Sequence, residues 1–90
     1  MKLSIIEFNS FRRDMRKIMK SGKNIKVLEE IVVKLANKEA LPAKNRDHSL
    51  VGNWSGHREC HIEPNWLLIY KINENELLLV RTGSHANLFG

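Results

Sequence analysis

The sequence predicts a small two-layer domain of the α+β class, in which two helices cover one face of an antiparallel sheet. Two patterns predict this class. Apolar residues recur at helical spacing in the first half of the chain, and from His57 onward they alternate as they do in strands. Because the chain has 90 residues, it can bury only one sizeable core, and residues 1–90 are expected to form a single domain.

The N-terminal half is expected to hold one strand followed by a helical hairpin. Residues 3–8 are apolar and partly β-branched, which predicts a strand, and Asn9-Ser10 are predicted to cap the next helix. The first helix is expected to end at Ser21-Gly22, and a second begins after Asn24, antiparallel to the first. Their inward faces are predicted to be Phe8, Phe11, Met15, Ile18 and Met19, and Val27, Leu28, Ile31, Val32 and Leu35.

The C-terminal half is expected to form a three-stranded antiparallel meander after a polar connection at residues 43–56. That connection is long for so small a domain, and loops of this length are often functional. Glu63-Pro64-Asn65-Trp66 and Asn73-Glu74-Asn75-Glu76 have the composition of tight turns. Two such turns join three strands, and each turn also determines which residues face each other.

This register sorts the strand residues onto two faces. His61 is predicted to face Leu68, and Leu68 to face Arg81. The apolar face, expected to lie against the helices, consists of Cys60, Ile62, Leu67, Ile69, Leu78 and Val80. The mixed face, expected to be open to a ligand, consists of His61, Trp66, Leu68, Tyr70, Leu77, Leu79 and Arg81. His61 and Arg81 would then lie roughly 10 Å apart, with a phosphate between their side chains.

Charge and cysteine content narrow the partners and the compartment. The formal net charge of +5 favours a nucleic acid or another acidic partner, although a basic protein without such a partner fits it equally well. The single cysteine cannot form an internal disulfide, and no apolar run reaches the roughly 20 residues needed to cross a bilayer. A cytoplasmic protein without membrane attachment is therefore expected.

Three motifs occur in order along the chain. They are Asp47-His48, the run HRECHIEPNWLLIY from His57 to Tyr70, and the closing RTGSHANLF from Arg81 to Phe89. With them the chain resembles the YafQ branch of the RelE-like (RelE/ParE) toxins over essentially its whole length. The resemblance implies a RelE-like fold and the toxin of a type II toxin–antitoxin pair, an endoribonuclease that cuts mRNA in the ribosomal A site. It also implies neutralisation by an acidic cognate antitoxin, contact with operator DNA only through the antitoxin complex, and no cofactor.

The residues themselves suit such chemistry. Cleaving RNA without a metal requires a base for the ribose 2′-hydroxyl, an acid for the departing 5′-oxygen, and cations around the phosphate. Histidine can serve as base or acid near neutral pH, and arginine can hold two phosphate oxygens at once. The products would be a 5′-hydroxyl fragment and a cyclic or terminal 3′-phosphate.

The resemblance maps the catalytic roles onto three histidines. His85 is predicted to be the general acid, and either His48 or His61 the base. Arg81 is the candidate for stabilising the transition state, and Arg58 is a second candidate. Bases are predicted to stack on Trp66 and Phe89. Asn65 occupies a position where the family pattern has aspartate, and an amide cannot act as a base.

Two other functions fit part of the sequence, a zinc site and a binding protein without catalytic activity. Cys60, His61, His48 and His57 could form a zinc site, but adjacent strand residues point to opposite faces, so Cys60 and His61 are not expected to share an ion. The chain could instead be an inactive toxin relative that binds antitoxin or nucleic acid. The remaining histidine, His57, is interpreted as a surface residue, and Trp54 and Tyr70 as packing residues.

Overall fold

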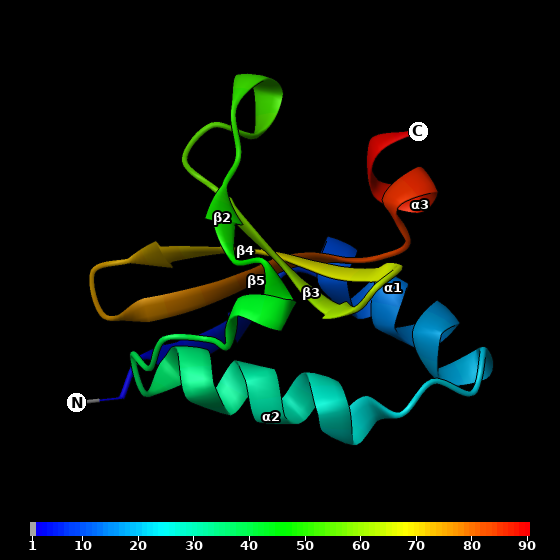
Figure 1. Cartoon of the computed structure of the whole chain (residues 1–90), viewed down its shortest axis with the longest axis horizontal. Coiled ribbons are helices and arrows are strands. Elements are labelled where there is room, and N and C mark those ends of the chain that lie inside the picture. The colour runs from blue at the N-terminus through cyan, green and yellow to red at the C-terminus, as the bar shows by residue number, and fades with distance from the viewer. Residues whose placement is uncertain (1) are drawn as a thin grey trace.

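The computed structural model describes residues 2–90 and has a five-stranded sheet with two long helices against one face, as Figure 1 shows. The predicted α+β class is confirmed. The first half consists of β1 (Ser4–Glu7), α1 (Asn9–Lys20) and α2 (Ile25–Ala36). The second half consists of η1 (Ala43–Asn45), β2 (His48–Ser49), η2 (Gly52–Trp54), β3 (Arg58–Glu63), β4 (Trp66–Asn73), β5 (Glu76–Gly83) and α3 (His85–Phe89).

The sheet order is β1-β5-β4-β3-β2, with β1 parallel to β5 and all other neighbours antiparallel. The predicted meander of β3, β4 and β5 is confirmed. β1 joins it at the far edge, because α1 and α2 provide the long crossover that a parallel pair needs. At the opposite edge, residues 48–49 of the polar connection form β2, where no strand was predicted. This short strand holds His48 next to β3.

Both predicted helices are present, but only α2 has the predicted cap. Asn24 caps α2, and its side chain accepts a hydrogen bond from the backbone nitrogen of Lys26 at 3.1 Å. The cap predicted for α1 at Asn9-Ser10 is wrong, because both residues lie inside the helix. The Ser10 hydroxyl instead donates to the carbonyl oxygen of Val80 at 2.6 Å, which ties α1 to β5.

The main core lies between the two helices and one face of the sheet. Burying an apolar side chain there contributes about 1.5–3 kcal/mol. The helices contribute Phe11, Ile18, Leu28, Ile31, Val32, Leu35 and Ala36, and the sheet contributes Cys60, Ile62, Trp66, Leu68, Tyr70, Leu77 and Leu79. Phe8 and Met19, predicted to face inward, are exposed. Residues 2–90 include no helix with the length and apolar character needed to span a bilayer.

The predicted register holds next to each turn and is wrong beyond the bulge that each hairpin contains. Glu63 faces Trp66 as predicted, but His61 faces Leu67, so Ile62 is an extra residue in β3. In the second hairpin Tyr70 faces Leu79 as predicted, but Ile69 faces Arg81, so Val80 is an extra residue in β5. One extra residue moves the following side chains to the opposite face.

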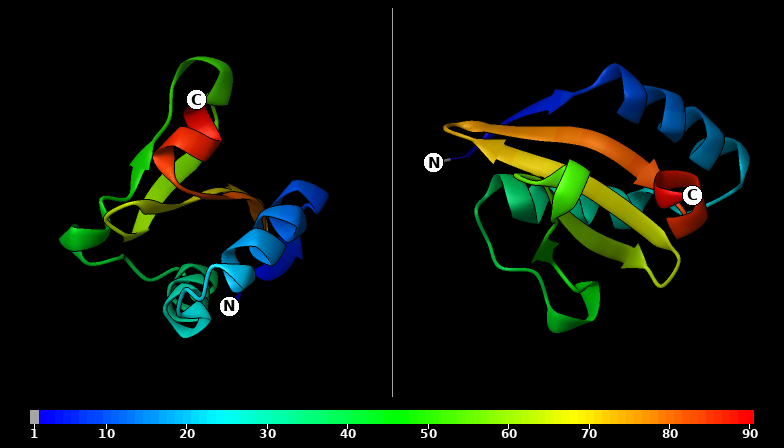
Figure 2. Two further views of the ribbon diagram at one scale, coloured as in Figure 1. Left: turned by 90° about the vertical axis from the view of Figure 1, so that its right-hand side faces the viewer. Right: turned by 90° about the horizontal axis from the view of Figure 1, so that it is seen from above.

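As a result, the predicted faces of β4 and β5 are reversed. Leu67, Ile69 and Val80 lie on the face away from the two long helices, where they form a second apolar cluster with Leu88 of α3. Leu50, Trp54 and Leu78 pack against this cluster. Figure 2 shows α3 and the β2–β3 loop on that side of the sheet, opposite α1 and α2. These two segments border the face that carries the candidate site.

Candidate active site

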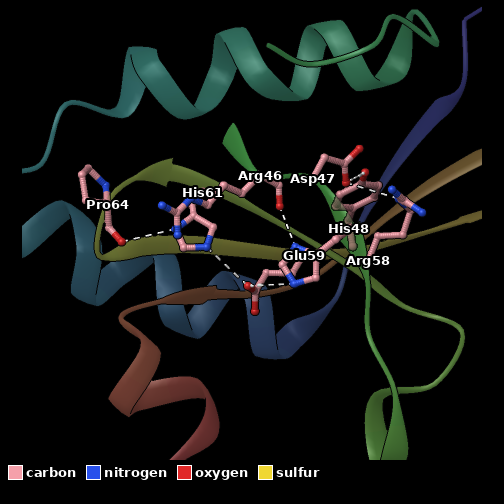
Figure 3. A network of polar contacts seen from close by, with 8 residues as sticks. Arg46, Asp47, His48, Arg58, Glu59, His61 and Pro64 are labelled. Carbon is pink, nitrogen blue, oxygen red and sulfur yellow. Dashed lines mark hydrogen bonds and ion pairs between the residues drawn. The ribbon is translucent and has the colours of Figure 1, made fainter. Parts of the chain in front are cut away.

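His48 and His61 meet at a buried carboxylate, as Figure 3 shows. The Nε2 atom of His48 lies 3.5 Å from Oε1 of Glu59, and the Nε2 atom of His61 lies 3.6 Å from the same oxygen. The Glu59 side chain is only 7% exposed, whereas those of His48 and His61 are 49% and 21% exposed. Two imidazoles that a ligand could reach therefore share one buried carboxylate.

The ring contacts decide which nitrogens are available for proton transfer. His48 Nδ1 lies 2.6 Å from the carbonyl oxygen of Arg46, and His61 Nδ1 lies 3.3 Å from that of Pro64. Because a carbonyl oxygen can only accept, each Nδ1 donates its hydrogen there. Each Nε2 atom is then the ring position that can take up or release a proton, beside Glu59.

A second polar cluster fixes the strand that carries His48. The Asp47 carboxylate accepts hydrogen bonds from the Tyr70 hydroxyl at 2.6 Å and from Arg58 Nε at 3.2 Å. Arg58 also donates to the Ser49 hydroxyl at 2.8 Å. Burial, and then the bond to Asp47, raises the pKa of Tyr70, while bonds to Tyr70 and Asp47 raise the pKa of Arg58. Tyr70 is thus a polar anchor as well as a packing residue.

His85 is connected to His61 through the β3–β4 turn. Its backbone nitrogen lies 3.4 Å from the side-chain oxygen of Asn65, and the neighbouring Pro64 contacts the His61 ring. His85 is exposed at the start of α3, where Ser84 caps the helix by accepting from Asn87 N at 3.2 Å. The structure therefore brings His48 and His61 together directly, and links His85 to them through one turn.

Two predicted contact residues lie elsewhere. Trp66 is fully buried among the core residues and donates from Nε1 to the Thr82 hydroxyl at 2.9 Å, so the prediction that a base stacks on it is wrong. Arg81 does not lie across from His61. Arg81 instead donates two hydrogen bonds to the Asp14 carboxylate of α1, at 2.6 and 3.2 Å. These bonds raise the pKa of Arg81. The bulge at Ile62 turns Trp66 toward the core, and the bulge at Val80 displaces Arg81.

Phe89, at the end of α3, remains accessible to a ligand. The residue is 38% exposed, and its ring makes edge contacts with His85 at 5.0 Å and with Trp54 at 6.2 Å between ring centroids. Trp54 also makes an edge contact with His57 at 5.3 Å. His57 is half-buried rather than a surface residue, and its Nδ1 atom is buried without a hydrogen-bond partner among residues 2–90. This row of rings connects the β2–β3 loop to α3.

Sequence reasoning did not identify Glu59 or Arg46. Glu59 could have been found, because it lies two residues before His61 and the side chains of alternate strand residues share a face. Arg46 could not, since it follows η1 in a left-handed conformation (φ 46°) that no periodicity predicts. Cys60 points into the main core while His61 lies near the rim, so the two do not share a site.

Known proteins match the chain in sequence and fold. Residues 3–90 match the family described as bacterial toxin of type II toxin–antitoxin system, YafQ. The mRNA interferase toxin YafQ of Escherichia coli K12 is 40% identical over 87 residues, which cover 94% of this chain and 95% of that protein.

Two solved structures show how far the fold is shared. A copper-bound mutant toxin from Helicobacter pylori is 40% identical with a TM-score of 0.94, covering 97% of this chain and 99% of that one. A chain of the E. coli DinJ–YafQ toxin–antitoxin complex is 37% identical with a TM-score of 0.91, covering both chains fully.

Proposed function

The chain belongs to the YafQ family of bacterial type II toxins, and on this premise we propose that it cuts mRNA in the ribosomal A site by histidine acid–base catalysis. Membership of the family and the match to an mRNA interferase make it a toxin and an endoribonuclease. The observation that best supports the catalytic proposal is the pair of accessible histidines that share Glu59.

In the proposed reaction, a histidine Nε2 removes the proton from a ribose 2′-hydroxyl. The 2′-oxygen then attacks phosphorus, the bond from phosphorus to the 5′-oxygen breaks, and His85 donates a proton to that oxygen. The products are a 2′,3′-cyclic phosphate and a 5′-hydroxyl end. The link through Pro64 and Asn65 favours His61 over His48 as the base, because base and acid must flank one phosphate.

The residues around the histidines have supporting roles in this proposal. Glu59 stabilises the imidazolium that forms when the base takes up its proton. Arg58 and Arg81 already hold carboxylates, so any contribution to the phosphate would come from their remaining donors. Phe89 offers an open ring for base stacking, and Asn65 positions His85 through its backbone.

No metal takes part in the proposed reaction. The mutant toxin from Helicobacter pylori is copper-bound, but residues 2–90 of this chain include no group of three or more His, Cys, Asp or Glu side chains arranged to hold an ion. If the mechanism is right, a chelator that leaves ribosomes intact leaves cleavage by this protein unchanged.

We also propose that an acidic cognate antitoxin neutralises the protein in the cytoplasm, where mRNA is translated. The E. coli relative forms a complex with DinJ, and the net charge of +5 suits an acidic partner. Contact with operator DNA would then occur only through that complex. Because exposed charges are screened by salt, binding should weaken as salt rises.

The catalytic proposal can be tested by inducing the wild type, His85→Ala and His57→Ala in cells, and mapping transcript ends by primer extension. The wild type and His57→Ala should arrest growth and cut transcripts, whereas His85→Ala should do neither. Incubating purified protein with mRNA, with and without ribosomes, tests ribosome dependence. A wild type that neither arrests growth nor cuts RNA would instead support the inactive binding relative, and full activity of His85→Ala would exclude the role of His85.

A further inference from the structure

A pocket lies beside His61, on the edge of β3 that β2 leaves uncovered. Its volume is about 410 Å³, within the range of small-ligand sites. It is bounded by η1 on one side and by the β3–β4 turn on the other, and it is lined by Lys44, Asn45, Arg46, His61, Ile62, Glu63 and Pro64. His61 thus borders both this pocket and the Glu59 carboxylate.

The pocket is positively charged. Lys44 and Arg46 are exposed, and within residues 2–90 neither makes an ion pair. The acid in the pocket, Glu63, lies 3.8 Å from Lys23, which offsets its charge. Arg46 therefore differs from Arg58 and Arg81, whose guanidinium groups already bind Asp47 and Asp14.

The pocket is also tied to both histidines of the candidate site. The carbonyl oxygen of Arg46 accepts from the His48 ring at 2.6 Å, and the buried Asn45 amide donates to the carbonyl oxygen of His61 at 2.7 Å. These bonds hold Arg46 in its left-handed conformation. In Figure 3 its side chain extends in the direction of His61, and both residues line the same pocket.

We propose that this pocket binds a backbone phosphate of the RNA substrate, next to the linkage that is cut, with Arg46 as the main contact and Lys44 as a second. The proposal rests on the proposed ribonuclease function and adds a binding subsite to it. A guanidinium without a carboxylate partner can hold a phosphate bidentately, and phosphate contacts position a strand without reading its sequence. The subsite would thus hold the RNA in register beside His61.

The test uses the full-length protein and ribosomes programmed with defined mRNAs. We compare Arg46→Gln, Arg46→Lys and Lys44→Gln with Arg13→Gln, which removes the same charge from an exposed position on α1. Arg46→Gln should raise KM about tenfold and change kcat less than about threefold, because a charge-assisted hydrogen bond is lost in ground and transition states alike. Lys44→Gln should have a smaller effect, Arg46→Lys should restore part of the loss, and Arg13→Gln should match the wild type.

Two further measurements separate a phosphate contact from other roles. Between about 50 and 200 mM salt, the slope of log KM against log salt should be smaller by about one for Arg46→Gln. The loss should also be the same for mRNAs with different codons in the A site. An unchanged KM in an active Arg46→Gln, a loss confined to kcat, or a loss that depends on the codon would each overturn the subsite while leaving the ribonuclease function intact. An inactive wild type would overturn the function itself.

Discussion

Replacing Glu59 with glutamine tests the role of the carboxylate that joins His48 and His61. The substitution keeps the size and one acceptor oxygen of the side chain but removes its charge. Only the histidine that acts as the base becomes an imidazolium in the transition state, and its contact with the carboxylate contributes on the order of 0.5–1 kcal/mol. Since about 1.4 kcal/mol corresponds to a tenfold change in rate, kcat should fall roughly 2- to 5-fold.

The measurement is single-turnover cleavage of a defined mRNA on programmed ribosomes, because it isolates the chemical step from product release. Glu76→Gln is the matched control, since Glu76 is exposed at the start of β5 and makes no ion pair within residues 2–90. Melting temperatures of both variants show whether the fold is preserved. A folded Glu59→Gln that cleaves at the wild-type rate would refute the reasoning, and so would an equal loss in Glu76→Gln.

Three further predictions concern stability and reactivity. Asp14→Ala leaves Arg81 and the Thr82 backbone nitrogen without their shared acceptor, so the free energy of unfolding should fall by about 2–3 kcal/mol, measured by urea denaturation. Arg12→Ala, which breaks an exposed pair with Glu7, is its control and should change stability by less than about 0.5 kcal/mol. Burial raises the pKa of the Cys60 thiol from 9.0 to about 12, so iodoacetamide should modify the folded protein at least about a hundredfold more slowly than the unfolded one. Burial also raises the pKa of Tyr70. Because Cys60 and Tyr70 keep their protons in the folded state at a pH where the unfolded chain loses them, their contribution to the free energy of unfolding should be full below about pH 9 and decline toward pH 12. Tyr70→Phe should make that decline shallower, and an unchanged pH dependence would contradict the role of burial at Tyr70.

The sequence predicts the elements of this fold better than the way they face one another. Periodicity locates α1, α2 and the three strands of the meander, and the turn residues at Glu63–Trp66 and Asn73–Glu76 close both hairpins. The bulges at Ile62 and Val80 could not be read from the pattern. Residues 66–70 of β4 are apolar or aromatic on both faces and are all buried, so alternation gave no sign that the faces were reversed.

The candidate site was predicted in part for a similar reason. The three histidines come from the resemblance to the toxin family, and the structure places His48 and His61 at one carboxylate. The pairing of Arg58 and Arg81 with Asp47 and Asp14 depends on contacts between residues 11 and 67 positions apart. Such long-range ion pairs leave no local signal, and they decide which cations are available to a substrate.

The positions of the paired and unpaired cations indicate how the RNA would cross the site. Arg58 and Arg81 hold neighbouring elements in place through carboxylates, whereas Arg46 and Lys44 face a pocket and make no ion pair with any residue from 2 to 90. The second group can offer all of its donors to a phosphate, whereas Arg58 and Arg81 can offer only those that their ion pairs leave free. Because the second group lies on the side of His61 away from β4, the RNA should run along the uncovered edge of β3 toward the β3–β4 turn, where Asn65 contacts His85. The order of contacts along the strand would then be the subsite, the base and the acid.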